Sequence, residues 1–140
     1  MNLTLTPKKV LITFEMEELY TNSLVYGLAE DHNVYQAMKG SNIHRDAESA
    51  KQAGFDRPIA VGMLSYGLLC EWLAEIFGEE WHTGGELEVA FLKPVYFDSI
   101  VEVGGQQVPQ TDEWDAQLDV WIKDEEGNYL VSGKAFFKRG

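Results

Sequence analysis

Gly62 stands where a backbone amide could take part in chemistry. It begins a segment, Gly62 to Phe77, that is apolar at nearly every position and polar only at Glu71 and Glu75, spaced i and i+4. This pattern predicts a long buried helix, which Gly78 ends. The first N–H groups of a helix have no partner inside it, and the helix dipole favours negative charge there. Because glycine has no side chain, we expect an oxyanion to approach this amide closely.

A carboxylate and an imidazole earlier in the chain, Asp31 and His44, have the side-chain types used for acid–base catalysis near neutral pH. Their neighbours alone do not decide this, since His44 can be an ordinary loop histidine and Asp31 can cap a turn. Cys70 falls inside the predicted buried helix and is expected to be a small core residue. His32 and His82 lack the spacing of a known metal motif, so no metal site is predicted.

Length and charge restrict the class of protein. The chain has 140 residues and a mass of 15.8 kDa, with 11 basic and 23 acidic residues and a formal charge of −12. One domain covering residues 1–140 is expected. The negative charge argues against nucleic-acid and anionic-membrane partners. A single cysteine, no signal-like N-terminus and an apolar run (Val61 to Leu69) too short to span a bilayer predict a soluble, cytoplasmic protein.

The order of the predicted elements indicates an α+β fold. Apolar alternation and turn residues predict strands late in the chain, after the buried helix. A single buried helix needs a curved antiparallel sheet around it, and one sheet covers it only in part, so we expect a dimer. The expected elements are a strand at Val10–Glu15, helices at Thr21–Glu30 and Ala47–Gln52 (the latter capped by Asp46), the buried helix, and strands at Glu86–Leu92, Ser99–Val108, Trp114–Lys123 and Tyr129–Lys138.

Four sequence segments carry a family resemblance. They are LAEDHN at 28–33, IHRDAESA at 43–50, GFDRPIAVGM at 54–63 and FLKPV at 91–95. With these segments the chain resembles the MaoC-like dehydratase family, which includes the (R)-specific enoyl-CoA hydratases. The resemblance covers roughly Leu24 to Val103 and implies a hot-dog fold, a curved antiparallel sheet wrapped around one long helix.

The resemblance also implies a reaction. In that family an Asp and a His hold one water, which supplies both the hydroxyl and the proton, and a helix-start N–H binds the thioester oxygen. Carried over by position, these roles fall to Asp31, His44 and the Gly62 amide. The implied activity is a hydro-lyase acting on 2-enoyl or 3-hydroxyacyl thioesters, with coenzyme A as the expected carrier and no cofactor. The positions expected to contact substrate are Asn33, Arg57, Val61, Met63 and Tyr66.

The chain departs from the family signature at three places. Val34–Asn42 stands where the signature has only a proline, which separates Asp31 from His44 by more positions than usual. Glu30 and Val61 replace a glycine and a histidine. These departures keep two alternatives open, a hot-dog acyl thioesterase and a catalytically silent domain that binds an acyl ligand.

The expected partners follow from fold and charge. We expect a small acyl thioester as ligand, and a homodimer or a larger assembly such as a dimer of dimers. Coenzyme A carries phosphates, so an acidic protein must gather its cations locally to bind it. We predict that the acidic turns lie away from the site and that a basic rim forms from some of Lys39, Arg45, Lys51, Arg57 and Lys93.

Overall fold

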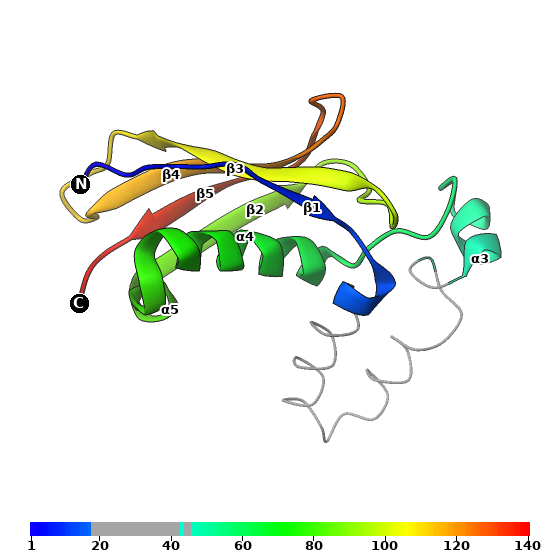
Figure 1. The fold of residues 1–140 in the computed structure, drawn as a ribbon, viewed down its shortest axis with the longest axis horizontal. Coiled ribbons are helices and arrows are strands. Elements are labelled where there is room, and N and C mark those ends of the chain that lie inside the picture. Colours follow the sequence, from blue (N-terminus) through cyan, green and yellow to red (C-terminus); the bar gives the residue numbers. More distant parts are fainter. Residues whose placement is uncertain (18–42, 44–45) are drawn as a thin grey trace, which may run out of the picture.

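The computed structural model describes residues 1–17, 43 and 46–140 (Figure 1). The predicted helix Thr21–Glu30 lies outside this part of the chain. The helices are α3 (Ala47–Gln52), α4 (Gly62–Phe77), a 3₁₀ turn η1 (Gly78–Glu80) and α5 (Trp81–Gly84). The strands are β1 (Lys8–Leu11), β2 (Gly85–Phe91), β3 (Ile100–Val108), β4 (Ala116–Asp124) and β5 (Tyr129–Phe137).

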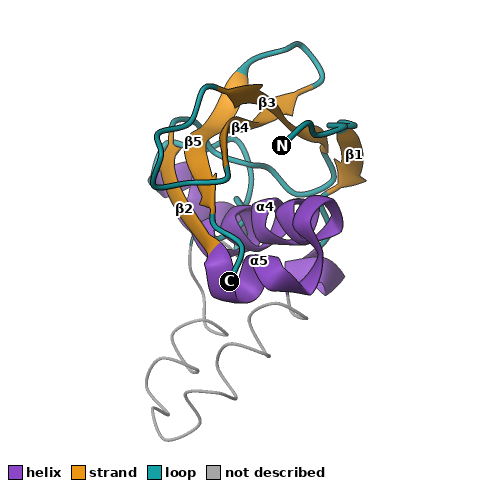
Figure 2. Ribbon diagram, turned by 90° about the vertical axis from the view of Figure 1, so that its left-hand side faces the viewer, coloured by secondary structure: helices purple, strands orange, loops and turns teal. Residues whose placement is uncertain are grey.

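The strands form one antiparallel sheet in the order β1-β3-β4-β5-β2, and α4 runs along one of its faces (Figures 1 and 2). Strand alternation explains which side chains meet the helix. Val103 pairs with Ile122 across β3 and β4, and both side chains are buried. The chain therefore has the predicted α+β architecture, with the sheet covering the apolar side of one long helix.

Helix α4 has the predicted bounds, Gly62–Phe77. Its buried apolar side chains pack into the core with those of the sheet. Gly78 ends it with φ 76°, a left-handed conformation that glycine adopts without steric cost. The buried apolar residues of α4 are Leu64, Leu68, Leu69, Trp72 and Leu73.

Two predicted elements differ from the structure. The first strand ends at Leu11 instead of Glu15, because Thr13 caps a helical turn at residues 14–17: its hydroxyl oxygen accepts the Met16 N–H at 3.1 Å. The segment after Gly78 was expected to be β-like, yet residues 78–84 form η1 and α5 before β2 starts. Both differences come from local hydrogen bonds that residue periodicity does not reveal.

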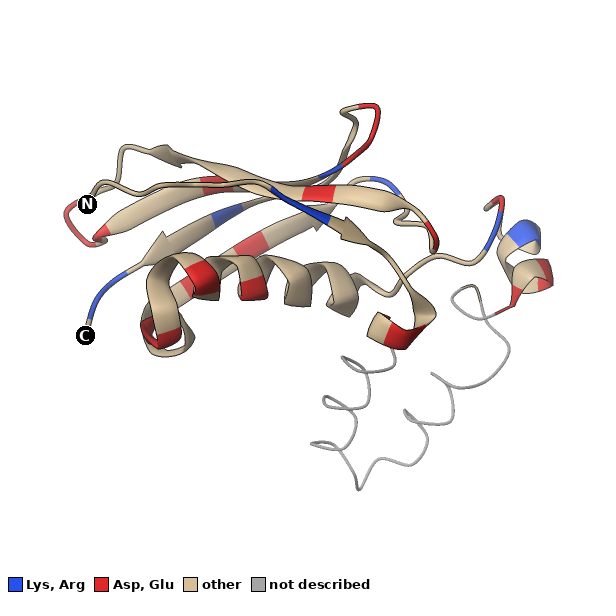
Figure 3. Ribbon diagram, viewed as in Figure 1, with Lys and Arg blue, Asp and Glu red and all other residues tan. Residues whose placement is uncertain are grey.

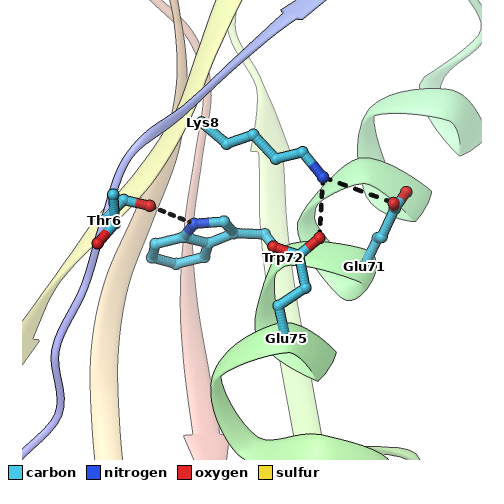
Figure 4. Close-up of polar contacts among 5 residues, drawn as sticks. All are labelled: Thr6, Lys8, Glu71, Trp72 and Glu75. Atoms are coloured by element: carbon cyan, nitrogen blue, oxygen red, sulfur yellow. Dashed lines mark hydrogen bonds and ion pairs between the residues drawn. The ribbon is translucent and has the colours of Figure 1, made fainter.

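The polar side of α4 is tied to the N-terminal strand (Figure 4). The Trp72 indole N–H donates to the Thr6 carbonyl oxygen at 2.9 Å. The Lys8 ammonium lies 2.8 Å from the Glu75 carboxylate and 3.6 Å from that of Glu71. The hydrogen bond to Glu75 is the main reason why the pKa of Lys8 is raised. The two glutamates predicted to mark the wet side of the helix thus form half-exposed ion pairs with β1.

Candidate active site

The segment before α4 is held against the loop that follows β2. Ile59 forms a β-bridge with Tyr96, and the Ala60 N–H donates to the Val95 carbonyl at 2.7 Å. The Ile59 N–H donates to the Ile43 carbonyl oxygen at 3.0 Å. These bonds fix the direction from which the chain reaches the helix.

The described residues leave two amides of the first turn of α4 without an acceptor. Val61 is the N-cap residue, with φ −68° and ψ 149°, and its carbonyl accepts the Leu64 N–H at 3.0 Å. No described residue places an acceptor against the N–H of Gly62 or of Met63. Binding of a ligand oxygen by the Gly62 N–H is the role that the sequence predicts, and it remains a prediction.

A buried carboxylate that the sequence analysis did not single out occupies the preceding amide. Glu17, in the helical turn at 14–17, is only 1% exposed, and its Oε1 accepts the Val61 N–H at 2.7 Å. Glu17 lies in the run Glu15-Met16-Glu17-Glu18, which by composition is typical of a solvated surface. The helical turn that the Thr13 cap starts buries Glu17, whereas Glu15 in the same turn is exposed.

Gly62 faces an open, mostly apolar pocket of about 370 Å³. A Cβ atom at Gly62 would lie 3.0 Å from the Phe91 ring, so the ring packs close to the helix start. Phe91 is 57% exposed and forms part of the pocket wall, while the Ser65 side chain, one turn along α4, is buried. The lining residues are Phe55, Ile59, Ala60, Gly62, Ser65, Phe91, Leu92, Lys93, Pro94 and Val95. An apolar wall beside amide donors that no described residue occupies suits an acyl group joined to a carbonyl.

A second pocket, of about 350 Å³, shares Lys93 and Pro94 with the first and contains Arg57. The Arg57 guanidinium lies over the Tyr96 ring, 5.1 Å from its centroid. The acidic turn at 124–126 lines the same pocket. The pKa of Asp124 is lowered, first by the Asn128 side chain and to a lesser extent by the charge of Lys93.

The predicted basic rim is therefore only partly present. Arg57 and Lys93 do come together, but carboxylates accompany them, contrary to the expected separation of acidic turns from the cations (Figure 3). Lys51 lies in α3 and lines neither pocket. Lys39 and Arg45 lie outside the described residues.

The other predicted site residues divide into three groups. Val61 and Gly62 form the helix start. Met63 is 45% exposed, and neither it nor Tyr66 lines the pocket at Gly62; the pKa of Tyr66 is raised mainly by burial. Asp31, Asn33 and His44 lie outside the described residues, so their roles remain predictions.

Two further properties concern the described ranges alone. Among these residues, no three His, Cys, Asp or Glu side chains are placed to hold a metal ion together. None of the helices in the described part of the chain is long and apolar enough to cross a membrane.

Comparison with known proteins identifies the family. A family model described as a MaoC like domain matches residues 18–126. The chain belongs to the MaoC-like domain family. The match includes the segments of Asp31 and His44 and the start of α4, and it confirms the resemblance found in the sequence. No curated protein sequence matches the chain.

Solved structures of similar fold include MaoC-like proteins and (R)-hydratases. The (R)-hydratase from A. caviae involved in PHA biosynthesis is 20% identical, with a TM-score of 0.68 over 100% of this chain and 98% of that chain. The R-hydratase PhaJ1 from Pseudomonas aeruginosa is 18% identical, with a TM-score of 0.71 over 99% of this chain and 81% of that chain. A MaoC-like dehydratase from Phytophthora capsici is 19% identical, with a TM-score of 0.66 over 96% of this chain and 42% of that chain. These likenesses confirm the hot-dog fold.

Proposed function

We propose that this MaoC-like protein is a hydro-lyase that adds water to a 2-enoyl thioester or removes it from a 3-hydroxyacyl thioester. The observation that carries the proposal is the helix start: Gly62, whose N–H no described residue occupies, lines an apolar pocket walled by Phe91. Addition of water to the β-carbon moves negative charge onto the thioester oxygen. A preorganised amide donor lowers the barrier to that step.

In the proposed reaction, Asp31 and His44 hold the water. Its oxygen bonds to the β-carbon, the C=C electron pair moves to form an enolate, and the Gly62 N–H binds the enolate oxygen. The proton that leaves the water is returned to the α-carbon through the same pair of side chains, so atoms and charge balance. The hydrogen bond from Ile59 to Ile43 supports the role of His44, because it ties the residue before His44 in the sequence to the segment that leads into α4.

The proposed assembly is a homodimer formed along β2. This strand is an edge of the sheet, and an edge strand offers unpaired backbone groups to a second strand. Phe91 and Leu92, at its end, are 57% and 54% exposed. A second copy would cover these side chains and the open side of the pocket at Gly62.

Loss of the enoyl absorbance of crotonyl-CoA tests the activity, with longer and branched enoyl thioesters assayed beside it. We expect water addition by the unmodified protein and a fall in kcat of about 10²- to 10⁴-fold in His44→Ala. Release of free thiol, followed in parallel, would instead identify a thioesterase. Binding without turnover across the panel would identify a silent acyl-binding domain, and either result would overturn the proposal.

A further inference from the structure

The carboxylate of Glu17 has an unusual position for an acidic side chain. It is 1% exposed, although an ionised carboxylate loses much of its hydration when it is buried. It comes from the turn after β1, a part of the sequence remote from α4, and its Oε1 binds the Val61 N–H at 2.7 Å.

This bond occupies the N-cap amide at the start of α4. In a capping box, a Glu of the first helical turn reaches back to the N-cap N–H. Here Glu17 supplies that acceptor from outside the helix. With the Val61 N–H occupied, the next donors are those of Gly62 and Met63, and Gly62 faces the pocket.

The same bond also fixes the orientation of the Gly62 amide. The Ala60 N–H is held by the Val95 carbonyl at 2.7 Å and the Val61 N–H by Glu17, so two consecutive peptide groups are anchored to separate elements. The Val61 carbonyl, in the same planar peptide group as the Gly62 N–H, accepts the Leu64 N–H at 3.0 Å, so the Glu17 bond on one side of Val61 and the helical bond on the other together set the direction of the Gly62 N–H. From this geometry we propose that Glu17 is a positioning residue, which keeps Val61 from the substrate oxygen and aims the Gly62 N–H at it. This inference rests on the proposed function.

Three variants of Glu17 separate positioning from a general structural role. Glu17→Gln keeps an oxygen acceptor of the same reach, whereas Glu17→Leu removes the acceptor. Glu17→Asp keeps the charge but is too short by one methylene group. Small errors in the placement of a reacting group cost up to about 10²-fold in rate. We therefore expect kcat for crotonyl-CoA to fall about 10- to 100-fold in Glu17→Leu and Glu17→Asp, with KM little changed, and to stay within about threefold in Glu17→Gln.

The activities are compared per folded molecule, with the folded fraction of each variant measured by circular dichroism. The inference is overturned if Glu17→Asp keeps the wild-type kcat. It is also overturned if kcat falls as much in Glu17→Gln as in Glu17→Asp. This comparison decides the matter even if Glu17→Leu fails to fold.

A second measurement separates failure of this inference from failure of the proposed function. Hydrogen exchange of the Val61 amide, followed in ¹⁵N-labelled protein, needs no substrate. We expect slow exchange in the wild type and in Glu17→Gln, and faster exchange in Glu17→Asp. An inactive wild type with this exchange pattern would refute the hydro-lyase proposal but leave the anchoring by Glu17 in place. Equal exchange in all three proteins would refute the anchoring itself.

Discussion

At the scale of single residues, Arg57 and Lys93 are the cations that would affect the choice of acyl carrier if the proposed function holds. They line a pocket next to the one at Gly62, but the acidic turn at 124–126 lines it too. The phosphates of coenzyme A would be attracted by the two cations and repelled by the carboxylates. The net preference for a phosphate-bearing carrier therefore depends on the balance between these charges.

Neutralising the two cations together, as Arg57→Gln with Lys93→Gln, should raise KM for crotonyl-CoA by about three- to tenfold, because each exposed charge contributes modestly. KM for crotonyl-pantetheine, which lacks the nucleotide phosphates, should not change. Steady-state kinetics with both thioesters checks this. The matched control, Glu125→Gln with Glu126→Gln, should lower KM for crotonyl-CoA. An equal change of KM for both thioesters would show that these side chains do not contact the carrier phosphates.

Asp46, the N-cap of α3, provides a pH-dependent contact. Its carboxylate accepts the hydroxyl of Ser49 at 2.7 Å and the backbone N–H of Ser49 at 3.1 Å. The Ser49 hydroxyl is the main cause of its lowered pKa, followed by the backbone N–H. A carboxyl group whose pKa is lower in the folded state stabilises the fold above its unfolded pKa, and this stabilisation is lost as the pH falls through the folded value.

We therefore expect the cap on α3 to be intact at neutral pH and lost on acidification below about pH 4. The ¹H chemical shift of the Ser49 amide reports this transition. Asp46→Asn should keep the cap, since asparagine is an equally good N-cap residue, and should abolish the titration. A titration of the same amplitude in Asp46→Asn would assign the pH dependence to another group.

At the scale of elements, the contact between α4 and the N-terminal segment of Thr6 and β1 combines two interactions of different strength. Trp72 is 3% exposed and packs in the core while its indole N–H reaches Thr6. Lys8 and its glutamate partners have side chains that are about half exposed. Buried aromatic surface stabilises far more than a solvent-screened ion pair.

Trp72→Ala should accordingly lower the free energy of unfolding by about 3–5 kcal/mol. Lys8→Ala should lower it by less than about 1 kcal/mol, and by less still in high salt. Urea denaturation at two salt concentrations measures both changes. If Lys8→Ala lowered the free energy of unfolding as much as Trp72→Ala, the ion pairs rather than packing would hold β1 on the helix.

The elements also show how far the sequence determines the fold. Helix α4 was predicted with its observed bounds because apolar residues nearly surround it and Gly78 ends it. The strand expected to reach Glu15 stops at Leu11, since the Thr13 cap starts a helical turn within a β-branched run. Because of that error the sequence analysis did not single out Glu17. Its side chain is buried only because residues 14–17 are helical. The Gly62 amide could be predicted from the sequence, whereas its anchoring by Glu17 is a long-range contact that local pattern cannot reveal.

At the scale of the whole molecule, the two edges of the sheet differ. The β2 edge ends in exposed Phe91 and Leu92 beside the pocket, while the β1 edge has only four residues and ends in Leu11, which is 50% exposed. The longer edge with the larger exposed apolar surface is the better site for a second copy.

The two leucines provide a matched test of the proposed dimer. The wild type should have twice the 15.8 kDa chain mass in light scattering after size exclusion. Leu92→Asp should shift the equilibrium toward monomer, because a charge would be buried at the interface, and Leu11→Asp should not. A monomeric wild type, or dissociation by Leu11→Asp alone, would contradict dimerisation along β2.

The most direct test of the proposed chemistry removes the Gly62 N–H with a residue that the helix start accepts. Gly62 is the first residue of α4, a position that proline favours, and Val61 has φ −68° and ψ 149°, which suit a residue before proline. Gly62→Pro should therefore fold but lose the donor. Gly62→Ala keeps the donor and adds a similar Cβ contact to Phe91 at 3.0 Å. We predict that kcat for hydration of crotonyl-CoA falls about 10²- to 10³-fold in Gly62→Pro and far less in Gly62→Ala. A folded Gly62→Pro variant that hydrates crotonyl-CoA as fast as Gly62→Ala would contradict the account.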